Sequence, residues 1–316
     1  MEASLLTLEI KPYNVGLKET WDAVVSKAKN ATFLHYRDYM DYHSHRFVDA
    51  SVLVFLKGKA VAAFPCNCIE EDIVSHGGLT YGGLLYGKDL HASEILEIFR
   101  LLGDHFRQQG KRKIIYKAVP SVFHKYPADE DLYALTRVGA SLFRRDLSSV
   151  VDIEGRPKLS DSRKSTAKKA QKIGGNVVEL EDLSQFHVLL THVLKKFNAA
   201  PIHSLEELQL LKTRFPGAIK LFGTVIQERL EAAALIYDCG HVVHTQYLAS
   251  SDDGRRSGAL DFLLLTLIEK NFSGRKYFSF GISTEDGGRV LNEGLIAQKE
   301  GFGGRGVVHD FYEWIL

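Results

Sequence analysis

Residues 241–282 read HVVHTQYLASSDDGRRSGALDFLLLTLIEKNFSGRKYFSFGI and decide how we interpret the fold. The β-branched and aromatic residues at 241–249 predict a strand. The polar run 250–258 is typical of a loop, and the apolar run 259–272 predicts a helix. A second strand is predicted at 276–282. Strands that alternate with a helix in this way indicate a mixed α/β (α+β) domain.

The same order of elements occurs earlier in the chain. Two strands are predicted at 219–226 and 230–238, directly before the quoted segment. The first half has a helix at 18–29, strands at 51–56 and 60–68, a glycine-rich stretch at 75–83, a helix at 92–109 and a strand at 113–119. The two halves share this order of elements more than they share identical residues. We interpret the repeated pattern as an internal duplication. Gly155 and Pro157 interrupt the pattern, so the sequence predicts two domains, 1–154 and 155–316.

Length and charge limit the class of protein. The chain has 316 residues, with 40 Lys and Arg against 39 Asp and Glu, a net charge of +1. Such a balance gives no overall electrostatic field that would attract nucleic acid or an anionic membrane. Any site for an anion must therefore be local. Cys66, Cys68 and Cys239 show no zinc-binding spacing. Residues 1–10 lack the features of a signal peptide, and we expect a soluble, cytoplasmic protein without a membrane span or metal.

A basic run at 160–175 stands out against this near-neutral background. It holds Arg163, Lys164, Lys168, Lys169 and Lys172 against one acid. One interpretation is a site for a phosphate-bearing acceptor, bound through Lys164 and Lys168. The alternative is a solvated helix face. Nucleic acid is less expected, because no aromatic residues interleave with the cations.

Three segments carry a resemblance to a known family. The strand 277–282, the run Lys299-Glu300-Gly301-Phe302-Gly303 and the basic segment 162–170 are together similar to tandem GNAT acyltransferases of the Fem-like type, a bacterial group. The resemblance implies two tandem GNAT-like domains, each a mixed, mostly antiparallel sheet flanked by helices. It also implies an acyl donor, acetyl-CoA or another acyl-CoA, and an amine acceptor such as a small molecule, an amino sugar or a cell-envelope precursor.

A donor site is expected in the second domain, where a loop precedes a helix. The first amides of a helix attract an anion, so this loop predicts contacts with the CoA pyrophosphate. The residues concerned are Arg255, Arg256, Ser257, Gly258 and Ala259. They do not fall into the usual register of the family's pyrophosphate loop, and a solvated turn is the alternative.

Candidate catalytic and acceptor residues lie elsewhere. Glu293 precedes an apolar stretch, and we expect partial burial to make it a general base. Lys299 resembles the family lysine that stabilises charge on the acyl carbonyl. Tyr247 is predicted to line the cleft, with core packing as the alternative. His76, Tyr81 and Asn292 are further candidates for acceptor contact.

Three functions are compatible with these patterns. The first is an N-acyltransferase that uses acyl-CoA. The second is a Fem-like transferase that takes an amino acid from aminoacyl-tRNA, although the coiled-coil arm of some such enzymes is missing. The third is a non-catalytic tandem GNAT-like binding module. A P-loop and the metalloprotease motif H-E-x-x-H are absent from the sequence.

Overall fold

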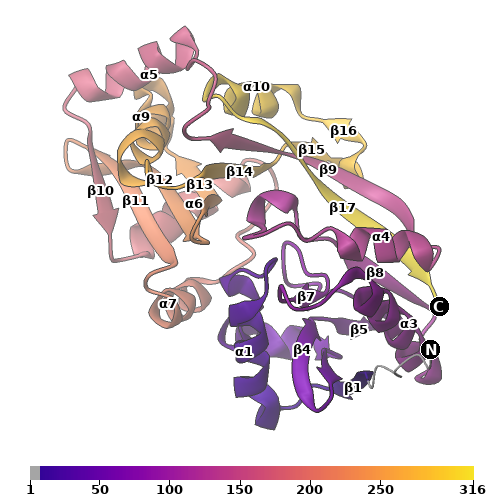
Figure 1. The fold of residues 1–316 in the computed structure, drawn as a ribbon. Coiled ribbons are helices and arrows are strands. Elements are labelled where there is room, and N and C mark those ends of the chain that lie inside the picture. The colour runs from indigo at the N-terminus through magenta and orange to yellow at the C-terminus, as the bar shows by residue number, and fades with distance from the viewer. Residues whose placement is uncertain (1–7) are drawn as a thin grey trace. The chain divides into compact units, whose positions relative to one another are not determined.

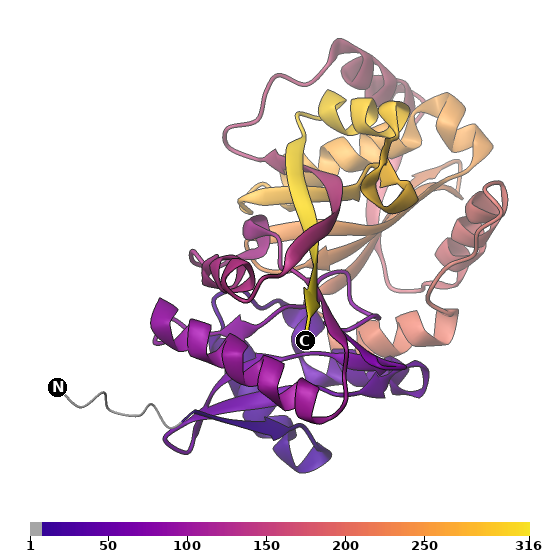
Figure 2. The same cartoon turned by 90° about the vertical axis from the view of Figure 1, so that its right-hand side faces the viewer.

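A computed structural model describes residues 8–316 and divides the chain into two compact units (Figure 1). Unit 1 holds the chain up to Asp146 together with Val308–Leu316, and unit 2 is Leu147–Val307. Strands β9 (Ser141–Asp152) and β17 (Arg305–Ile315) each pass from one unit to the other, and β17, yellow in Figure 2, ends in unit 1. The domain boundary predicted between residues 154 and 155 stays a prediction.

Unit 1 contains strands and helices in the order that the pattern predicted, with additional short strands. Its elements are β1 (Leu8–Pro12), α1 (Lys18–Lys27), α2 (Arg37–Met40), β2 (Val48–Asp49), β3 (Val52–Leu56), β4 (Lys59–Phe64), β5 (Asn67–Ile69), β6 (Asp72–Val74), β7 (Leu85–Tyr86), α3 (Ala92–Gln108), β8 (Lys113–Lys117) and α4 (Glu130–Arg137). The predicted strand 60–68 is two strands, because the chain leaves the sheet at Pro65.

Two sheets form unit 1. Strands β1-β3-β4-β7 pair antiparallel in that order. A second set follows the order β17-β8-β6-β5-β2, in which β6 and β8 are parallel. Strand β7 is the last strand of the first sheet and forms no ladder with β8. Strand β6 pairs with one edge of β8 instead.

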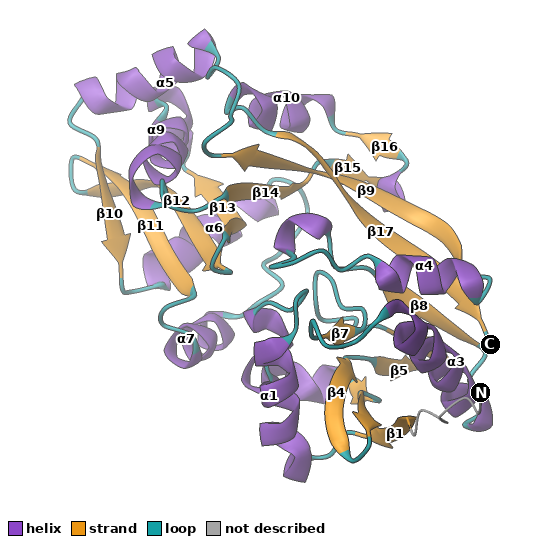
Figure 3. Ribbon diagram, viewed as in Figure 1, coloured by secondary structure: helices purple, strands orange, loops and turns teal. Residues whose placement is uncertain are grey.

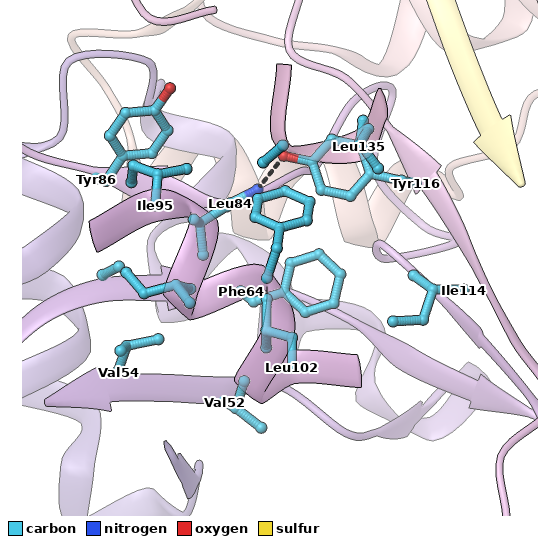
Figure 4. Close-up of a cluster of buried hydrophobic side chains, with 14 of the residues drawn as sticks. Val52, Val54, Phe64, Leu84, Tyr86, Ile95, Leu102, Ile114, Tyr116 and Leu135 are labelled. Carbon is cyan, nitrogen blue, oxygen red and sulfur yellow. Dashed lines mark hydrogen bonds between the residues drawn. The ribbon is translucent and has the colours of Figure 1, made fainter. Parts of the chain in front are cut away.

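The core of unit 1 lies between α3 and the strands (Figure 4). Helix α3 buries Ile95, Phe99 and Leu102 on one face, and these pack against Phe64 and other strand side chains. In Figure 4 the hydroxyl of Tyr116 accepts a hydrogen bond from the Leu84 amide at 2.7 Å. This bond ties the segment that enters β7 to the core.

Unit 2 repeats the order of elements. It contains α5 (Asp161–Lys172), β10 (Asn176–Leu180), α6 (Ser184–Lys195), α7 (Leu205–Arg214), β11 (Ile219–Ile226), β12 (Arg229–Asp238), β13 (Val242–Ser250), α8 (Asp252–Ser257), α9 (Ala259–Thr266), β14 (Tyr277–Ile282), β15 (Thr284–Glu285), β16 (Val290–Leu291) and α10 (Glu293–Gly301). The sequence predicted a loop at 250–258 and one helix at 259–272. Instead, Ser251 caps the short helix α8, and α9 passes into a π-helical turn at Leu267–Asn271.

One sheet runs through unit 2 in the order β10-β11-β12-β13-β14-β9. All its pairs are antiparallel except β13–β14, which is parallel. Helix α9 covers one face and α6 the other (Figure 3). The apolar side chains of α9 pack on alternate residues of β12, because residues two apart on a strand share a face. The predicted mixed α/β class with flanking helices is confirmed.

Within residues 8–316, no helix is both apolar enough and long enough to cross a membrane. The same residues contain no group of three or more His, Cys, Asp or Glu side chains that could hold a metal ion.

Candidate functional site

Strands β13 and β14 separate in the middle of the unit 2 sheet. Their parallel pairing begins at Val242 with Tyr277 and ends at His244 with Ser279. Past His244, no strand within residues 8–316 pairs with this edge of β13. Backbone groups at 245–249 can therefore bind an extended ligand on that side.

Each strand has an irregularity at the point of separation. On β13, Gln246 is an extra residue between the pairs Leu235–Tyr247 and Ile236–Thr245. On β14, the register with β9 shifts between Ser279 and Ile282. Bulges of this kind increase twist and redirect side chains, which explains why the two strands diverge.

Lys299 of α10 holds the end of β14 in this position. Its Nζ donates to the carbonyl oxygens of Gly281 and Ile282 at 2.9 and 2.6 Å, and to Ser283 Oγ at 2.8 Å. Burial lowers the pKa of Lys299 to about 8. Three bonds use all three donors of an ammonium group, so in this conformation the lysine fixes the strand. Its predicted contact with an acyl carbonyl stays a prediction.

The chain turns sharply between α8 and α9. Gly258 ends α8 and begins α9 with φ +80°, a left-handed conformation that favours glycine. A Cβ at Gly258 would lie 2.2 Å from the carbonyl oxygen of Thr166 in α5. No side chain caps α9 at its N-terminus. The turn thus places the positive end of α9 beside α5, with the carboxylate of Asp261 in its first turn.

A cavity of about 650 Å³ lies at this helix terminus. Its lining combines apolar and polar residues from α5, the end of α6, β13, α8, α9 and α10: Arg163, Thr166, Val193, Phe197, Leu248, Ser250, Gly254, Arg255, Gly258, Leu260, Asp261, Gly294, Leu295 and Gln298. Leu248 and Ser250 belong to the part of β13 that has separated from β14. The cavity thus reaches the unpaired part of β13 at Leu248 and Ser250.

The charges in the cavity leave one cation without a partner. Arg163 Nη1 donates to both carboxylate oxygens of Asp261 at 2.9 and 2.8 Å. Burial raises the pKa of Asp261, and the Arg163 cation opposes that shift. Among the described residues, Arg255 makes no ion pair. A bound anion would therefore meet Arg255 and the N-terminus of α9 together.

The predicted pyrophosphate residues do not all face this cavity. Arg255 and Gly258 line it. Arg256 is paired with Asp253 and, with Ser257, lines a different cavity. Ala259 is fully buried in the core. The cause is that 252–257 is a turn and a half of helix, which turns successive side chains in different directions.

The basic segment forms α5, with two distinct faces. Ala167 and Ala170 are buried, and Arg163 and Thr166 line the cavity described above. The other face carries Lys164, Lys168, Lys169 and Lys172, which line a hollow of about 470 Å³. Among residues 8–316, Lys164 is the one of these lysines that forms an ion pair, at 4.0 Å from Asp161. Their predicted binding of an acceptor phosphate stays a prediction.

The partial burial expected for Glu293 is wrong. Glu293 is exposed in the first turn of α10, because Asn292 caps the helix and directs this turn outward. Asn292 Oδ1 accepts the Leu295 amide at 2.9 Å, and its Nδ2 donates to Glu285 at 2.7 Å. Asn292 therefore has a structural role in this conformation. The proposed roles of both residues in chemistry and substrate binding stay predictions.

Two predicted residues of unit 1 are packed inside it. His76 is 4% exposed and Tyr81 is 3% exposed. The hydroxyl of Tyr81 donates to Thr32 Oγ1 at 3.3 Å, and the carbonyl of His76 accepts from Lys117 Nζ at 3.0 Å. Both side chains belong to the packed interior, so their contact with a substrate stays a prediction.

Tyr247 has a partner that the sequence did not reveal. Its hydroxyl lies 2.7 Å from His203 Nδ1. His203 comes just before Ser204, the cap of α7. A histidine before a helix cap gave no signal by itself, because its partner is 44 residues away on another element.

Comparisons with known proteins agree on the fold. No family model matches the sequence, and no curated protein does. Among solved structures, FemX is similar over 98% of this chain and 97% of its own, with a TM-score of 0.68 at 11% identity. L-PGS from Bacillus licheniformis is similar over 94% of this chain and 91% of its own, with a TM-score of 0.62 at 14% identity. A tandem GNAT protein from the clavulanic acid biosynthesis pathway is similar over 98% of this chain and 98% of its own, with a TM-score of 0.52 at 12% identity. Identities this low show the fold alone, and this chain has a GNAT-like fold.

Proposed function

We propose that the protein is an N-acyltransferase that binds an acyl-CoA donor in unit 2 and transfers the acyl group to an amine. The observation that carries the proposal is the cavity at the N-terminus of α9, which holds Arg255, a cation with no ion pair among the described residues, and is lined by Leu248 and Ser250 from the unpaired part of β13. The neighbours of the same fold include FemX and a tandem GNAT protein, which supports a transferase at this coarse level.

The cavity fits the two ends of such a donor. Arg255 and the first turn of α9 suit the pyrophosphate, because a cation and unpaired amides both stabilise an anion. Apolar side chains such as Leu248 and Leu295 suit the linear chain that leads from it. Backbone groups at the separated part of β13 can then hold the acyl end beside Tyr247.

Transfer of the acyl group to an amine requires a base that accepts the amine proton. We keep Glu293 in that role, because the next two residues, Gly294 and Leu295, line the cavity. Transfer to an exposed carboxylate through water remains compatible with general-base catalysis. A Glu293→Gln variant should then lower kcat by about a hundredfold or more with little change in either KM.

Arg255 and Arg256 provide a matched pair for testing the donor site. Arg255→Ala should weaken CoA and acetyl-CoA binding roughly tenfold or more, since a charge-assisted contact contributes about 1.5–3 kcal/mol. Arg256→Ala should change binding less than about twofold, because its side chain pairs with Asp253 and lines another cavity. Isothermal titration measures both. Equal affinities for the wild type and Arg255→Ala, or no binding by the wild type at millimolar CoA, would contradict the proposal.

The lysine face of α5 favours a second candidate, an aminoacyl-tRNA donor. Helix α5 lines the cavity with one face and presents unpaired lysines with the other, so a polyanion leaving the cavity would meet Lys168 and Lys172. These two positions are four apart and share a helix face. Under this alternative, Lys168→Glu with Lys172→Glu should abolish salt-dependent tRNA binding. Lys270→Glu, an exposed lysine outside both cavities, is the control.

A further inference from the structure

An exposed aromatic ring lines the cavity at the N-terminus of α9 (the donor cavity). Phe197 is 70% exposed, and among the described residues that line this cavity it is the one with an aromatic side chain. A single exposed apolar side chain is common on protein surfaces and needs no explanation of its own. Phe197 differs because the same cavity holds Arg255, which makes no ion pair within residues 8–316. A flat apolar surface and a cation therefore line one cavity.

The end of helix α6 holds the backbone of Phe197 in one conformation. The Asn198 amide donates to the Lys195 carbonyl at 3.1 Å. The Ala199 amide donates to the Leu194 carbonyl, also at 3.1 Å. These are the two hydrogen bonds of a Schellman motif, and Asn198 has the left-handed conformation that such a helix end requires, with φ +54°. A regular turn thus carries the ring of Phe197, although the side chain itself is exposed.

The end of α6 also lies against helix α8, which carries Arg255. Lys196 Nζ donates to Asp252 Oδ1, in the first turn of α8, at 2.7 Å. Both side chains are partly exposed, so the ion pair adds little stability, but it joins the residue before Phe197 to the helix of Arg255. Val193, four residues before Phe197, lines the same cavity and is only 9% exposed. Phe197 and Arg255 therefore line the donor cavity from neighbouring elements.

A flat ring beside a cation suits a nucleotide. Aromatic side chains bind nucleobases by stacking, and a neighbouring cation binds the phosphate. In acyl-CoA the adenosine is joined directly to the pyrophosphate, so a pyrophosphate held at Arg255 places the adenine next to it. The linear chain of the donor has no flat group, and aliphatic side chains such as Leu248 and Leu295 suit it. Phe197 thus matches the part of the donor that these other lining residues do not contact.

We propose that Phe197 binds the adenine of the donor by stacking, an inference that rests on the proposed function. The role is one of binding, since no bond of the donor changes at the adenine. Stacking holds the nucleotide end of the donor, and the linear chain then extends from Arg255 past Leu248 on β13. Because every base has an aromatic face, this contact detects the presence of a base and not its hydrogen-bonding pattern.

Titration with the two portions of CoA tests this assignment. Adenosine bisphosphate is the portion that contains the adenine, and phosphopantetheine is the portion that lacks it. Phe197→Ala should weaken binding of CoA and of adenosine bisphosphate by the same factor, about fivefold to a hundredfold, since one stacked base contributes on that order. Phosphopantetheine should bind this variant within about twofold of the wild type, because separate contacts contribute independently. The exposed position of Phe197 means that the variant should keep the stability of the wild type.

Two further variants separate stacking from general apolar contact. Phe197→Leu keeps a large apolar side chain but has no ring, so it should bind CoA nearly as weakly as Phe197→Ala. Phe197→Trp keeps a ring and should bind CoA at least as tightly as the wild type. Phe143→Ala is the matched control, because Phe143 is an exposed phenylalanine of unit 1 that does not line the donor cavity. It should bind CoA as the wild type does.

Fluorescence of the Phe197→Trp variant reports the contact without any assay of activity. The wild type has two tryptophans, Trp21 and Trp314, and both are buried in unit 1. The indole introduced at position 197 is exposed and gives a separate signal. A base that stacks on an indole quenches its fluorescence, so CoA and adenosine bisphosphate should quench this signal and phosphopantetheine should not.

The possible results separate this inference from the proposed function. Equal affinities of the wild type and Phe197→Ala for CoA would overturn the inference and leave the proposed function intact. Equal losses for CoA and phosphopantetheine would also overturn it, since Phe197 would then contact the linear chain. A wild type that binds neither CoA nor adenosine bisphosphate at millimolar concentration would instead overturn the proposed function and this inference together.

Discussion

Units 1 and 2 share an order of elements but differ where a ligand would enter. In unit 2 the edge of β13 is open beyond His244. In unit 1 the strand before the helix, β7, is likewise unpaired on one side within residues 8–316, but the strand after the helix, β8, is paired there with β6 from Asp72 to Val74, and the Gly82 amide bonds to the Lys117 carbonyl at 3.0 Å. The hairpin of β5 and β6 thus fills in one unit the opening that the other keeps. A duplicated fold can retain one open sheet and make the other a packed scaffold.

The helix after the fourth strand shows the same difference. Helix α3 of unit 1 begins with a capping box in which Glu94 accepts from the His91 amide at 2.8 Å. Helix α9 of unit 2 begins at Gly258 and has Arg255 nearby in the same cavity. A carboxylate caps the positive end of α3, whereas the carboxylate in the first turn of α9, that of Asp261, is held by Arg163.

The largest effect is expected at the corner before α9. Gly258→Ala adds a left-handed penalty of about 1–2 kcal/mol and a clash with the Thr166 carbonyl that adds about 1–3 kcal/mol. Gly174→Ala is the matched control, since Gly174 has φ +81° but open space around its Cβ position. Urea denaturation should show a loss for Gly258→Ala well above that of the control, and donor binding should fall as well. Equal losses of unfolding free energy in Gly258→Ala and Gly174→Ala would mean that the close contact with Thr166 of α5 does not determine the conformation of the site.

A smaller effect is expected at two buried lysines, Lys117 in unit 1 and Lys299 in unit 2. Lys299→Met leaves the Gly281 and Ile282 carbonyls without their donor, and Lys117→Met does the same to those of His76 and Leu79. Each should reduce the free energy of unfolding by about 1–3 kcal/mol. Only Lys299→Met should also lower kcat. A comparable fall in kcat for folded Lys117→Met would show that unit 1 contributes directly to the chemistry.

The sequence predicted the parts of this comparison that depend on local pattern. The predicted strands 51–56, 113–119, 219–226, 230–238 and 241–249 and the predicted helix 92–109 follow from periodicity. The predicted loop before α9 is instead largely the short helix α8. The hairpin β5–β6 was missed because its strands have three residues each, too few for an alternating pattern. The burial of Glu293 was wrong because an exposed helix turn and a buried one can have the same sequence pattern. His203 depends on a tertiary contact, which no local pattern encodes.

The packed interior of unit 1 should respond to pH through Asp131. Burial raises the pKa of this carboxyl to about 7, and Tyr116 donates to it at 2.6 Å. The folded state therefore binds a proton more tightly than the unfolded state, whose carboxyl has a pKa near 3.9. The stabilisation is complete below about pH 4 and is lost as pH rises to about 7, at no more than about 1.4 kcal/mol per pH unit. Asp131→Asn should flatten this part of a plot of unfolding free energy against pH, and an unchanged slope would assign it to another group.

The smallest effect is expected at the N-terminus of α3, where the comparison of the two helices can be tested by stoichiometry. Glu94→Ala removes the carboxylate from the capping box and should cost about 0.5–2 kcal/mol. If the edge of β8 is closed by β6, uncovering the helix end should not create a second donor site. Titration with acetyl-CoA should still give one site per chain, with an affinity within about twofold of wild type. A second site in Glu94→Ala would show instead that the carboxylate alone keeps unit 1 from binding a donor, and that the hairpin of β5 and β6 is not the barrier.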